Sequence, residues 1–212
     1  NQREVHTHTE SFSHALRAAL REDPDVIMVG EMRDKETVAM GLRAAMTGHL
    51  VLTTLHTNDA ISSVLRLKDM GAENYITAAT LQGVIAQRLV KRLCEYCKAP
   101  YVMTDDDKKW IEVLSSSKID EKNSVFYQGV GCAHCHHTGF QGRIGVYELL
   151  IIDEAMVIAL KNNQYNEFTR LAQQSRYYIP LQEAVLSYAL EGVTSLDEVL
   201  RVITSVNESQ FY

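Results

Sequence analysis

Three absences limit what this chain of 212 residues can be. No glycine is followed by lysine, so the loop G-x-x-x-x-G-K-[ST], whose backbone amides cradle phosphate groups, is missing. No apolar run approaches the ~20 residues that a membrane-spanning helix needs. A positive net charge is missing too, since the chain carries −6 at pH 7, and this argues against a general nucleic-acid binder.

An initiating methionine and a charged-then-apolar leader are also lacking at Asn1, where the chain starts abruptly. We therefore expect a chain that begins inside a domain. The cysteines are few and form two pairs, Cys94-x-x-Cys97 and Cys132-x-x-Cys135. Paired cysteines without a secretory leader favour a reducing compartment, and two disulfides in an exported protein are the alternative.

The composition that is present is globular, with 46% apolar and 23% charged residues. Residues 11–93 alternate between helical and strand patterns. Helices are predicted over 12–22, 35–46, from about 59 to 70 and from about 75 to 91, and strands over 26–29 and 50–54. The strand over 26–29 is continuously apolar, which is typical of a parallel strand covered on both faces. This order of elements predicts a parallel sheet with flanking helices, and hence an α/β fold.

The composition changes after Leu93 and again after residue 145. The segment 94–145 contains the cysteines, a charged and serine-rich stretch from Thr104 to Asn123, and one short helix expected near 106–114. Beyond it, helices are predicted over 149–161, 167–175, 181–191 and from Ser195 onward. We expect three segments: an α/β core at 1–93, a tetracysteine module at 94–145 and a helical bundle at 146–212.

The two cysteine pairs are the strongest chemical signal. A tetrahedral zinc site needs two chelating turns that each supply thiolates three residues apart, and both pairs have this spacing. Because four thiolates fill every position around zinc, we predict a structural ion and treat the nearby histidines as neighbours; these are His134, His136 and His137. A pair of redox dithiols is the alternative.

Titratable side chains lie close to both predicted strands. Glu31 follows the first strand, at the sheet edge where open α/β folds bind ligands; in phosphate-hydrolysing motors such an acid holds magnesium or orients a water. His49 and His56 bracket the second strand, where an imidazole can sense a phosphate or position a water. The alternatives are a solvated glutamate that caps the next helix and histidines that only join a capping network.

Three arginines are candidates for phosphate contacts. Arg17 and Arg21 lie four apart on the first predicted helix, so both project from nearly the same face, towards phosphate oxygens or a neighbouring subunit's carboxylates. Arg143 follows the second cysteine pair in a predicted turn flanked by glycines. A solvated surface arginine is the alternative in each case.

Together these motifs resemble those of the type II secretion and type IV pilus assembly ATPases. The segment 21–34 resembles the Walker B region of that family, and the segment 47–58 resembles its His box. The cysteine pairs, with the residues up to Glu148, resemble the tetracysteine module of the pilus-extension and secretion branch, which retraction ATPases generally lack. The opening residues 1–6 are similar to the retraction branch. This mixture suggests an extension ATPase such as those of mannose-sensitive haemagglutinin pili.

The resemblance implies a cytoplasmic, homo-hexameric motor of the P-loop type with a RecA-like sheet. Such a motor would use ATP and Mg²⁺ to move pilin or pseudopilin subunits through an inner-membrane platform protein, with no nucleic-acid partner and with membrane contact only through partners. By this resemblance the Walker B acid is Glu31, the His-box pair is His49 and His56, the phosphate contacts are Arg17, Arg21 and Arg143, and the Zn²⁺ ligands are Cys94, Cys97, Cys132 and Cys135.

The family's phosphate loop, its acidic Asp box and its amino-terminal domain lie outside these residues. We therefore expect the isolated chain to bind ATP weakly or not at all and to turn none over. Two other functions stay open. One is a zinc-ribbon module that docks a membrane platform protein, with the α/β part as its scaffold, and the other is a thiol redox protein.

Overall fold

A computed structural model describes residue 2, residues 4–114 and residues 124–207 of the chain. The chain forms two compact units, each assembled from segments that are distant in the sequence. The first unit comprises Asn1–Val84 and Leu150–Tyr178, and the second comprises Ile85–Leu149 and Ile179–Tyr212. These units run across the boundaries expected at 93 and 145, and the three-segment division stays a prediction.

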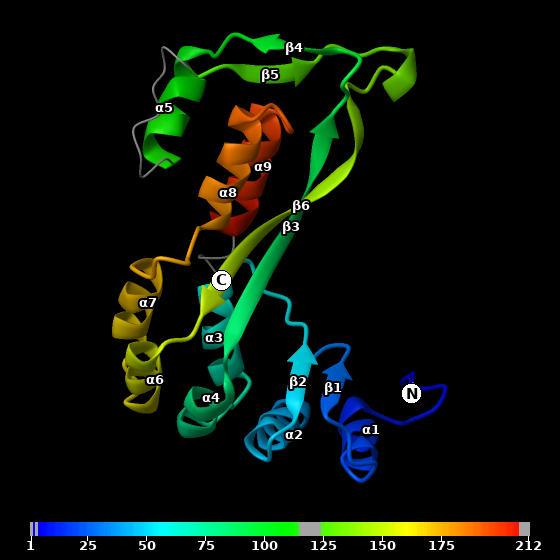
Figure 1. Cartoon of the computed structure of the whole chain (residues 1–212), viewed down its shortest axis with the longest axis vertical. Helices are drawn as coiled ribbons and strands as arrows, with labels where there is room; N and C mark the ends of the chain where they lie inside the picture. The colour runs from blue at the N-terminus through cyan, green and yellow to red at the C-terminus, as the bar shows by residue number, and fades with distance from the viewer. Residues whose placement is uncertain (1, 3, 115–123, 208–212) are drawn as a thin grey trace. The chain divides into compact units, whose positions relative to one another are not determined.

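The first unit is built on two parallel strands. β1 (Val26–Val29) pairs in parallel with β2 (Leu50–Thr53), and α2 (Lys35–Met46) connects them. The other helices of this unit are α1 (Phe12–Ala19), α3 (Ala60–Asp69), α4 (Asn74–Thr80), α6 (Glu154–Lys161) and α7 (Tyr165–Gln173) (Figure 1). The predicted α/β fold with parallel strands is confirmed.

Capping residues fix where these helices begin and end. The side chains of Ser11 and Asp59 accept hydrogen bonds from the backbone N–H groups three residues on, at 3.1 and 2.6 Å, as expected of N-caps. Gly48 has φ of +103° just after α2, a backbone conformation that glycine adopts readily at the end of a helix. The predicted helix over 12–22 is too long, because α1 ends at Ala19.

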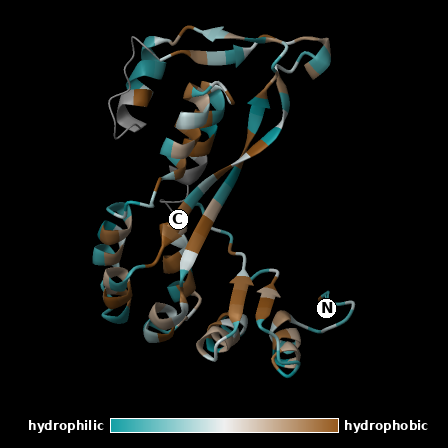
Figure 2. Ribbon diagram, in the orientation of Figure 1, coloured by the Kyte–Doolittle hydropathy of each residue, from teal (hydrophilic) through white to brown (hydrophobic). Residues whose placement is uncertain are grey.

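The sheet of the first unit is covered on one face only among the described residues. Ile27 and Val29 are buried in a core with residues of α1 and α2. We call the other face the open sheet face; it consists of Val26, Met28, Leu50 and Leu52. Met28 is 72% exposed, and Figure 2 shows both strands as hydrophobic. The prediction of a strand covered on both faces is therefore wrong for this part of the chain.

The second unit contains most of a long two-stranded ribbon, in which β3 (Gly83–Leu93) pairs with β6 (Phe140–Ile151). A shorter pair is antiparallel, β4 (Lys98–Tyr101) with β5 (Phe126–Gly129). The helices of this unit are α5 (Asp105–Leu114), the short 3₁₀ turn η1 (Ala133–Cys135), α8 (Leu181–Leu190) and α9 (Leu196–Asn207).

Two buried carboxylates hold α8 and α9 to the ribbon. Glu148 of β6 accepts a hydrogen bond from the backbone N–H of Leu181, at the start of α8, at 3.0 Å. Glu198 of α9 accepts one from the backbone N–H of Lys91 in β3 at 2.8 Å, and one from the guanidinium of Arg201 at 2.8 Å. Both carboxyl groups are buried, so these donors replace the hydrogen bonds that water would otherwise make.

The predicted helix over 75–91 is wrong beyond Thr80, where α4 ends. The buried side chains of β3 are Ala86, Val90 and Leu93, whose spacing also fits a helical face. Pairing with β6 selects the strand over the helix. At Gly83 a Cβ atom would lie 3.0 Å from the carbonyl oxygen of Leu150, so this glycine permits a close approach of the two chains.

The predicted helix over 149–161 is also wrong at its start, since residues 149–151 belong to β6. Asp153 caps α6 by accepting a hydrogen bond from the backbone N–H of Met156 at 2.9 Å. Of the helices in the expected carboxyl-terminal bundle, α6 and α7 belong to the first unit and α8 and α9 to the second, and the bundle stays a prediction. The opening residues Asn1 and Arg3, and part of the stretch Thr104–Asn123, lie outside the described residues.

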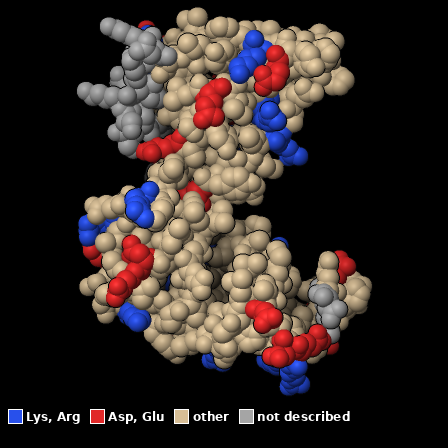
Figure 3. All heavy atoms as spheres, in the orientation of Figure 1, with Lys and Arg blue, Asp and Glu red and all other residues tan. Residues whose placement is uncertain are grey.

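None of the helices in the described part of the chain combines the length and the hydropathy that a bilayer crossing requires. On the face drawn in Figure 3, acidic and basic side chains are interspersed and do not gather into one large area of a single sign.

Candidate functional site

Glu31 and His56 meet beyond the carboxyl ends of β1 and β2. The hydroxyl of Thr54 donates to the carbonyl oxygen of Gly30 at 2.6 Å, and the backbone N–H of Met32 donates to the carbonyl oxygen of Thr54 at 3.2 Å. These bonds fix the chain on both sides of Glu31. Nε2 of His56 lies 3.2 Å from Oε2 of Glu31. The sheet edge therefore presents a carboxylate and an imidazole in contact.

Arg33 also contacts Glu31, and the sequence patterns did not single it out. Its Nε lies 2.6 Å from the same oxygen, Oε2. The side chain of Glu31 is 20% exposed, whereas Arg33 is 70% and His56 is 82% exposed. The hydrogen bond from Arg33 is the main cause that lowers the pKa of Glu31 below its usual value; burial opposes it and the bond to His56 adds to it. Glu31 is therefore an ionised carboxylate at neutral pH.

His49 lies at the other end of β2. Its Nδ1 is 2.9 Å from the carbonyl oxygen of Ala44 and 3.1 Å from the hydroxyl of Thr47, both at the carboxyl end of α2. Because the whole of β2 separates His49 from His56, the structure brings only His56 to Glu31. The role expected for His49 stays a prediction, and its contacts in this structure are those of a helix-terminating side chain.

Two of the candidate arginines lie near α1. Arg17, on α1, forms an ion pair with Glu36 of α2 at 3.2 Å, and both side chains are about 60% exposed. Arg21 follows the end of α1, so the two guanidinium groups do not share a helix face as predicted. Their expected contacts with phosphates remain predictions.

Arg143 lies in the second unit. The predicted glycine-flanked turn is part of β6, and Gly142 takes a φ of +75° within the strand. Arg143 is exposed there, and its expected phosphate contact remains a prediction.

The four cysteine side chains converge in the second unit. All four Sγ atoms lie within 4.8 Å of one another. The separations are 3.9 Å for Cys94 and Cys132, 3.8 Å for Cys97 and Cys135, and 3.8 Å for Cys132 and Cys135. Thiolates about 2.3 Å from one tetrahedral zinc ion would lie about 3.8 Å apart, whereas a disulfide needs about 2.05 Å. The donor set and its spacing fit a zinc ion.

Two thiols of this cluster have pKa values shifted in opposite directions. Burial raises the pKa of Cys135, but hydrogen bonds from the backbone N–H groups of Cys132 and Gly139 outweigh it and lower the pKa to about 6. Burial raises the pKa of Cys97 to about 12. A metal cation bound here would stabilise the thiolate form of all four cysteines together.

The frame around the cysteines is made of backbone contacts. The N–H of Cys94 donates to the carbonyl oxygen of Gly139 at 3.0 Å, and the N–H of Val130 donates to that of Cys97 at 3.1 Å. Between the two turns, Tyr96 and His134 stack with ring centroids 4.0 Å apart. His134 is thus a neighbour that braces the turns, and the metal-binding group found among the described residues consists of cysteines.

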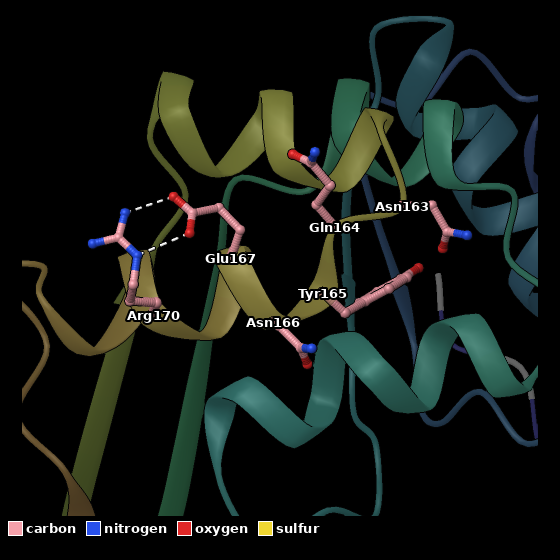
Figure 4. A pocket seen from close by; sticks show the side chains of 6 residues that line it. All are labelled: Asn163, Gln164, Tyr165, Asn166, Glu167 and Arg170. Carbon is pink, nitrogen blue, oxygen red and sulfur yellow. Dashed lines mark hydrogen bonds and ion pairs between the residues drawn. The ribbon is translucent and has the colours of Figure 1, made fainter.

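A shallow pocket in the first unit is lined by polar side chains outside the predicted site; they are Asn163, Gln164, Tyr165, Asn166, Glu167 and Arg170 (Figure 4). Most of these groups already have partners. Tyr165 donates to Asn74 at 2.7 Å, and Arg170 forms an ion pair with Glu167. The first of these contacts joins α7 to α4, and the second lies within α7.

The chain is similar to known proteins of secretion and pilus systems. It matches the family model of type II/IV secretion system proteins over residues 1–201. It is 46% identical over 193 residues to the type IV pilus assembly ATPase TfpB of Acinetobacter baylyi, and 42% identical over 193 residues to the type II secretion system ATPase E of Vibrio cholerae. Both matches cover 91% of this chain but only 32% and 37% of the relatives.

The solved structures give a similar result. The crystal structure of the pilus retraction motor PilT with bound ADP matches 95% of this chain and 46% of its own, with a TM-score of 0.65 and 33% identity. The chain therefore spans less than half of that motor and about a third of the curated relatives.

Proposed function

We propose, because the chain belongs to the family of type II/IV secretion system proteins, that it is the carboxyl-terminal part of an ATPase that powers type IV pilus assembly or type II secretion. Relatives with both names are more than 40% identical to it. The observation that carries the proposal is the ionised Glu31 beyond the carboxyl ends of two parallel strands, with His56 in contact. Open α/β sheets bind their ligands at that edge.

Within the intact enzyme, Glu31 would orient the attacking water or hold Mg²⁺, and His56 would sense or position groups beside it. ATP and Mg²⁺ supply the phosphoryl group and the charge that neutralises it. The phosphate loop is not among the 212 residues, and its backbone amides normally anchor the nucleotide. We therefore propose that the chain alone binds ATP weakly and does not hydrolyse it.

The cysteine cluster would hold a structural zinc ion, with Cys94, Cys97, Cys132 and Cys135 as ligands. Four thiolates leave no coordination position for water, so the ion would stabilise the fold and take no part in the reaction. Arg17, Arg21 and Arg143 would contact phosphates of their own or a neighbouring subunit.

The open sheet face supports the view that more of the protein covers this unit. Parallel sheets occur almost only where both faces are covered, and this face carries four exposed apolar side chains. We propose that the intact enzyme covers them, and that it works as a cytoplasmic homo-hexamer on an inner-membrane platform protein. The narrower assignment to mannose-sensitive haemagglutinin pili remains a prediction.

The second candidate function is a zinc-ribbon module that docks a membrane platform protein. The observation that favours it is the exposure of Tyr96 and Val130 beside the cysteine cluster, at 69% and 66%. Such exposed apolar side chains are typical of a contact surface.

Replacement of Glu31 by Gln in the intact protein separates these functions. For a motor, ATP hydrolysis should fall by roughly 10²–10⁴-fold, the usual contribution of a positioned acid or base, and pilus assembly or secretion should stop. The circular dichroism spectrum should not change. Glu154→Gln, on the exposed start of α6, is the matched control and should hydrolyse ATP at the wild-type rate. A docking module would function normally with Glu31→Gln, and that outcome would rule out the motor.

A further inference from the structure

Tyr96 and His134 occupy equivalent positions in the two cysteine turns. Each is the third residue of its C-x-x-C segment. Both turns are closed by the same backbone bond, from the N–H of the last cysteine to the carbonyl oxygen of the first, at 3.2 Å in each. The rings of the two residues stack, with centroids 4.0 Å apart and planes inclined by 16°. The contact therefore joins one chelating turn directly to the other.

Burial in a core does not explain this stack. Tyr96 is 69% exposed, and His134 is exposed as well. The buried cluster that the two turns share consists of cysteines. The two backbone bonds of the frame, at 3.0 and 3.1 Å, connect the first turn to residues that flank the second turn. The stacked rings thus add a contact from turn to turn that involves no sulfur atom.

Release of a metal ion bound by these four thiolates requires the two turns to separate. Each turn supplies two of the ligands, so the ion cannot leave while both chelating pairs stay closed around it. A contact between the turns that breaks on separation adds to the barrier for release. Stacked rings act in this way, because their attraction is lost when the ring planes move apart.

We propose that Tyr96 and His134 are positioning residues of the metal site: their stack holds the two cysteine turns together and slows the release of the bound ion. This inference rests on the zinc site of the proposed function and gives both residues a role in metal retention. They act through the turns and supply no ligand, because the four Sγ atoms, all within 4.8 Å of one another, already form a complete set.

The rate of zinc release from the 212-residue chain tests the proposal. The zinc-loaded chain is mixed with an excess of a colorimetric chelator at constant neutral pH, as wild type, Tyr96→Ala, His134→Ala and the double variant. Each single substitution should raise the rate about 2–5-fold, the lower part of the range for aromatic pairs, because both rings are exposed. The double variant should release zinc no faster than the single variants, since either change alone removes the stack.

Two further variants serve as controls. Tyr96→Phe keeps a ring in the stack and should release zinc at the wild-type rate. Glu95→Gln, at an exposed position of the same turn, should do the same. Unchanged rates in the alanine variants would overturn the proposal. Rates that multiply in the double variant would also overturn it, because they would show that the two residues act separately.

The absorption spectrum of the Co²⁺-loaded chain tests whether His134 is a ligand. All variants should give the same thiolate–cobalt bands, since the ligand set is unchanged. Altered bands in His134→Ala would show that the imidazole binds the ion, which contradicts a positioning role. A wild-type chain that binds no zinc would refute the proposed zinc site and this inference with it. Release rates that do not depend on the stack, in a chain that does bind zinc, refute the inference alone.

Discussion

Single carboxylates with several donors recur in this chain. Glu31 holds a guanidinium and an imidazole at the sheet edge, Glu148 accepts the first N–H of α8, and Glu198 joins α9 to β3. Asp34 accepts two hydrogen bonds from Thr37, both at 2.8 Å, and these lower its pKa. At the scale of residues, carboxyl groups are thus placed where backbone or cationic donors converge, and these donors lower the pKa of Glu31, Asp34 and Glu198.

The acid sensitivity of the second unit should follow from Glu198. Burial raises the pKa of this carboxyl, but the bonds from Arg201 and from the Lys91 backbone outweigh it, so the pKa lies below the usual 4.5. A lowered folded-state pKa means that the stabilisation is present above the unfolded pKa and is lost as pH falls through the folded one. Glu198→Gln should cost about 1.5–3 kcal/mol at pH 7 and show a weaker loss of stability in acid.

Urea unfolding at pH 7 and at about pH 3.5 tests this prediction, since the linkage of Glu198 acts between them. Glu191→Gln, at the exposed end of α8, is the control and should change stability little at either pH. Equal loss of stability on acidification in the wild type and in Glu198→Gln would contradict the assignment of this pH dependence to Glu198.

Residue types predicted the site in part. Glu31 and His56 follow consecutive strands, and parallel strands bring such positions to one edge, so their contact follows from the pattern. Arg33 has no such signal, because an arginine two residues after an acid is common on surfaces. The burial of Glu148 and Glu198 depends on partners far along the chain, such as Lys91, and no local pattern reveals it.

At the scale of elements, the cysteine turns are the most constrained part of the second unit. Gly129 and Gly139 approach so closely that a Cβ atom on Gly129 would lie 2.0 Å from the carbonyl oxygen of Gly139. Hydrogen bonds link each turn to the chain beside the other. A metal ion at the sulfurs would therefore hold together two turns whose shared buried cluster consists of cysteines.

Metal removal should loosen one part of the fold. Chelation, or Cys132→Ser, should remove on the order of 10 kcal/mol of metal-dependent folding free energy from the module, as in other thiolate-zinc sites. Hydrogen exchange should then accelerate over 94–145, while protection in β1 and β2 survives in part. Ala133→Ser, an exposed position in the same turn, is the matched control and should exchange like the wild type. Uniform acceleration in both units would show that the module is not separable.

The misassigned elements have a common physical cause. The segment after Thr80 contains apolar residues whose spacing fits a helix and a strand alike, and only pairing between β3 and β6, separated by more than 40 positions, selects the strand. Leu149 continues β6 for the same reason. By contrast, α2 and α3 carry their own capping residues, Asp34 and Asp59, so their limits can be read from local sequence.

At the scale of the whole molecule, the open sheet face is the surface that we propose is covered in the intact enzyme. Met28→Glu should change the stability of the 212-residue chain by no more than about 0.5 kcal/mol, because the side chain is already in water. In the intact enzyme the same change should cost about 1–3 kcal/mol, because we propose that this face is covered there.

Thermal and urea unfolding of both forms measures the difference. Val102→Glu, at an 87% exposed position of the second unit, is the control and should be tolerated equally in both. Equal tolerance of Met28→Glu in the two forms would show that no further layer covers the face. The sequence alone predicts a covered strand, and our proposal explains this prediction by burial of β1 in the whole protein.

The antiparallel pairing of β4 and β5 begins directly beside the cysteines, with Lys98 opposite Gly129, and reaches Tyr101 opposite Phe126. The chain between the two cysteine turns thus begins and ends in paired antiparallel strands. Each doubling of the length of a loop costs only about 0.6 kcal/mol of closure entropy. The paired strands β4 and β5 separate such a loop from the cysteine turns. We therefore expect that an insertion beyond Tyr101, such as a fluorescent reporter, leaves the two cysteine turns undisturbed.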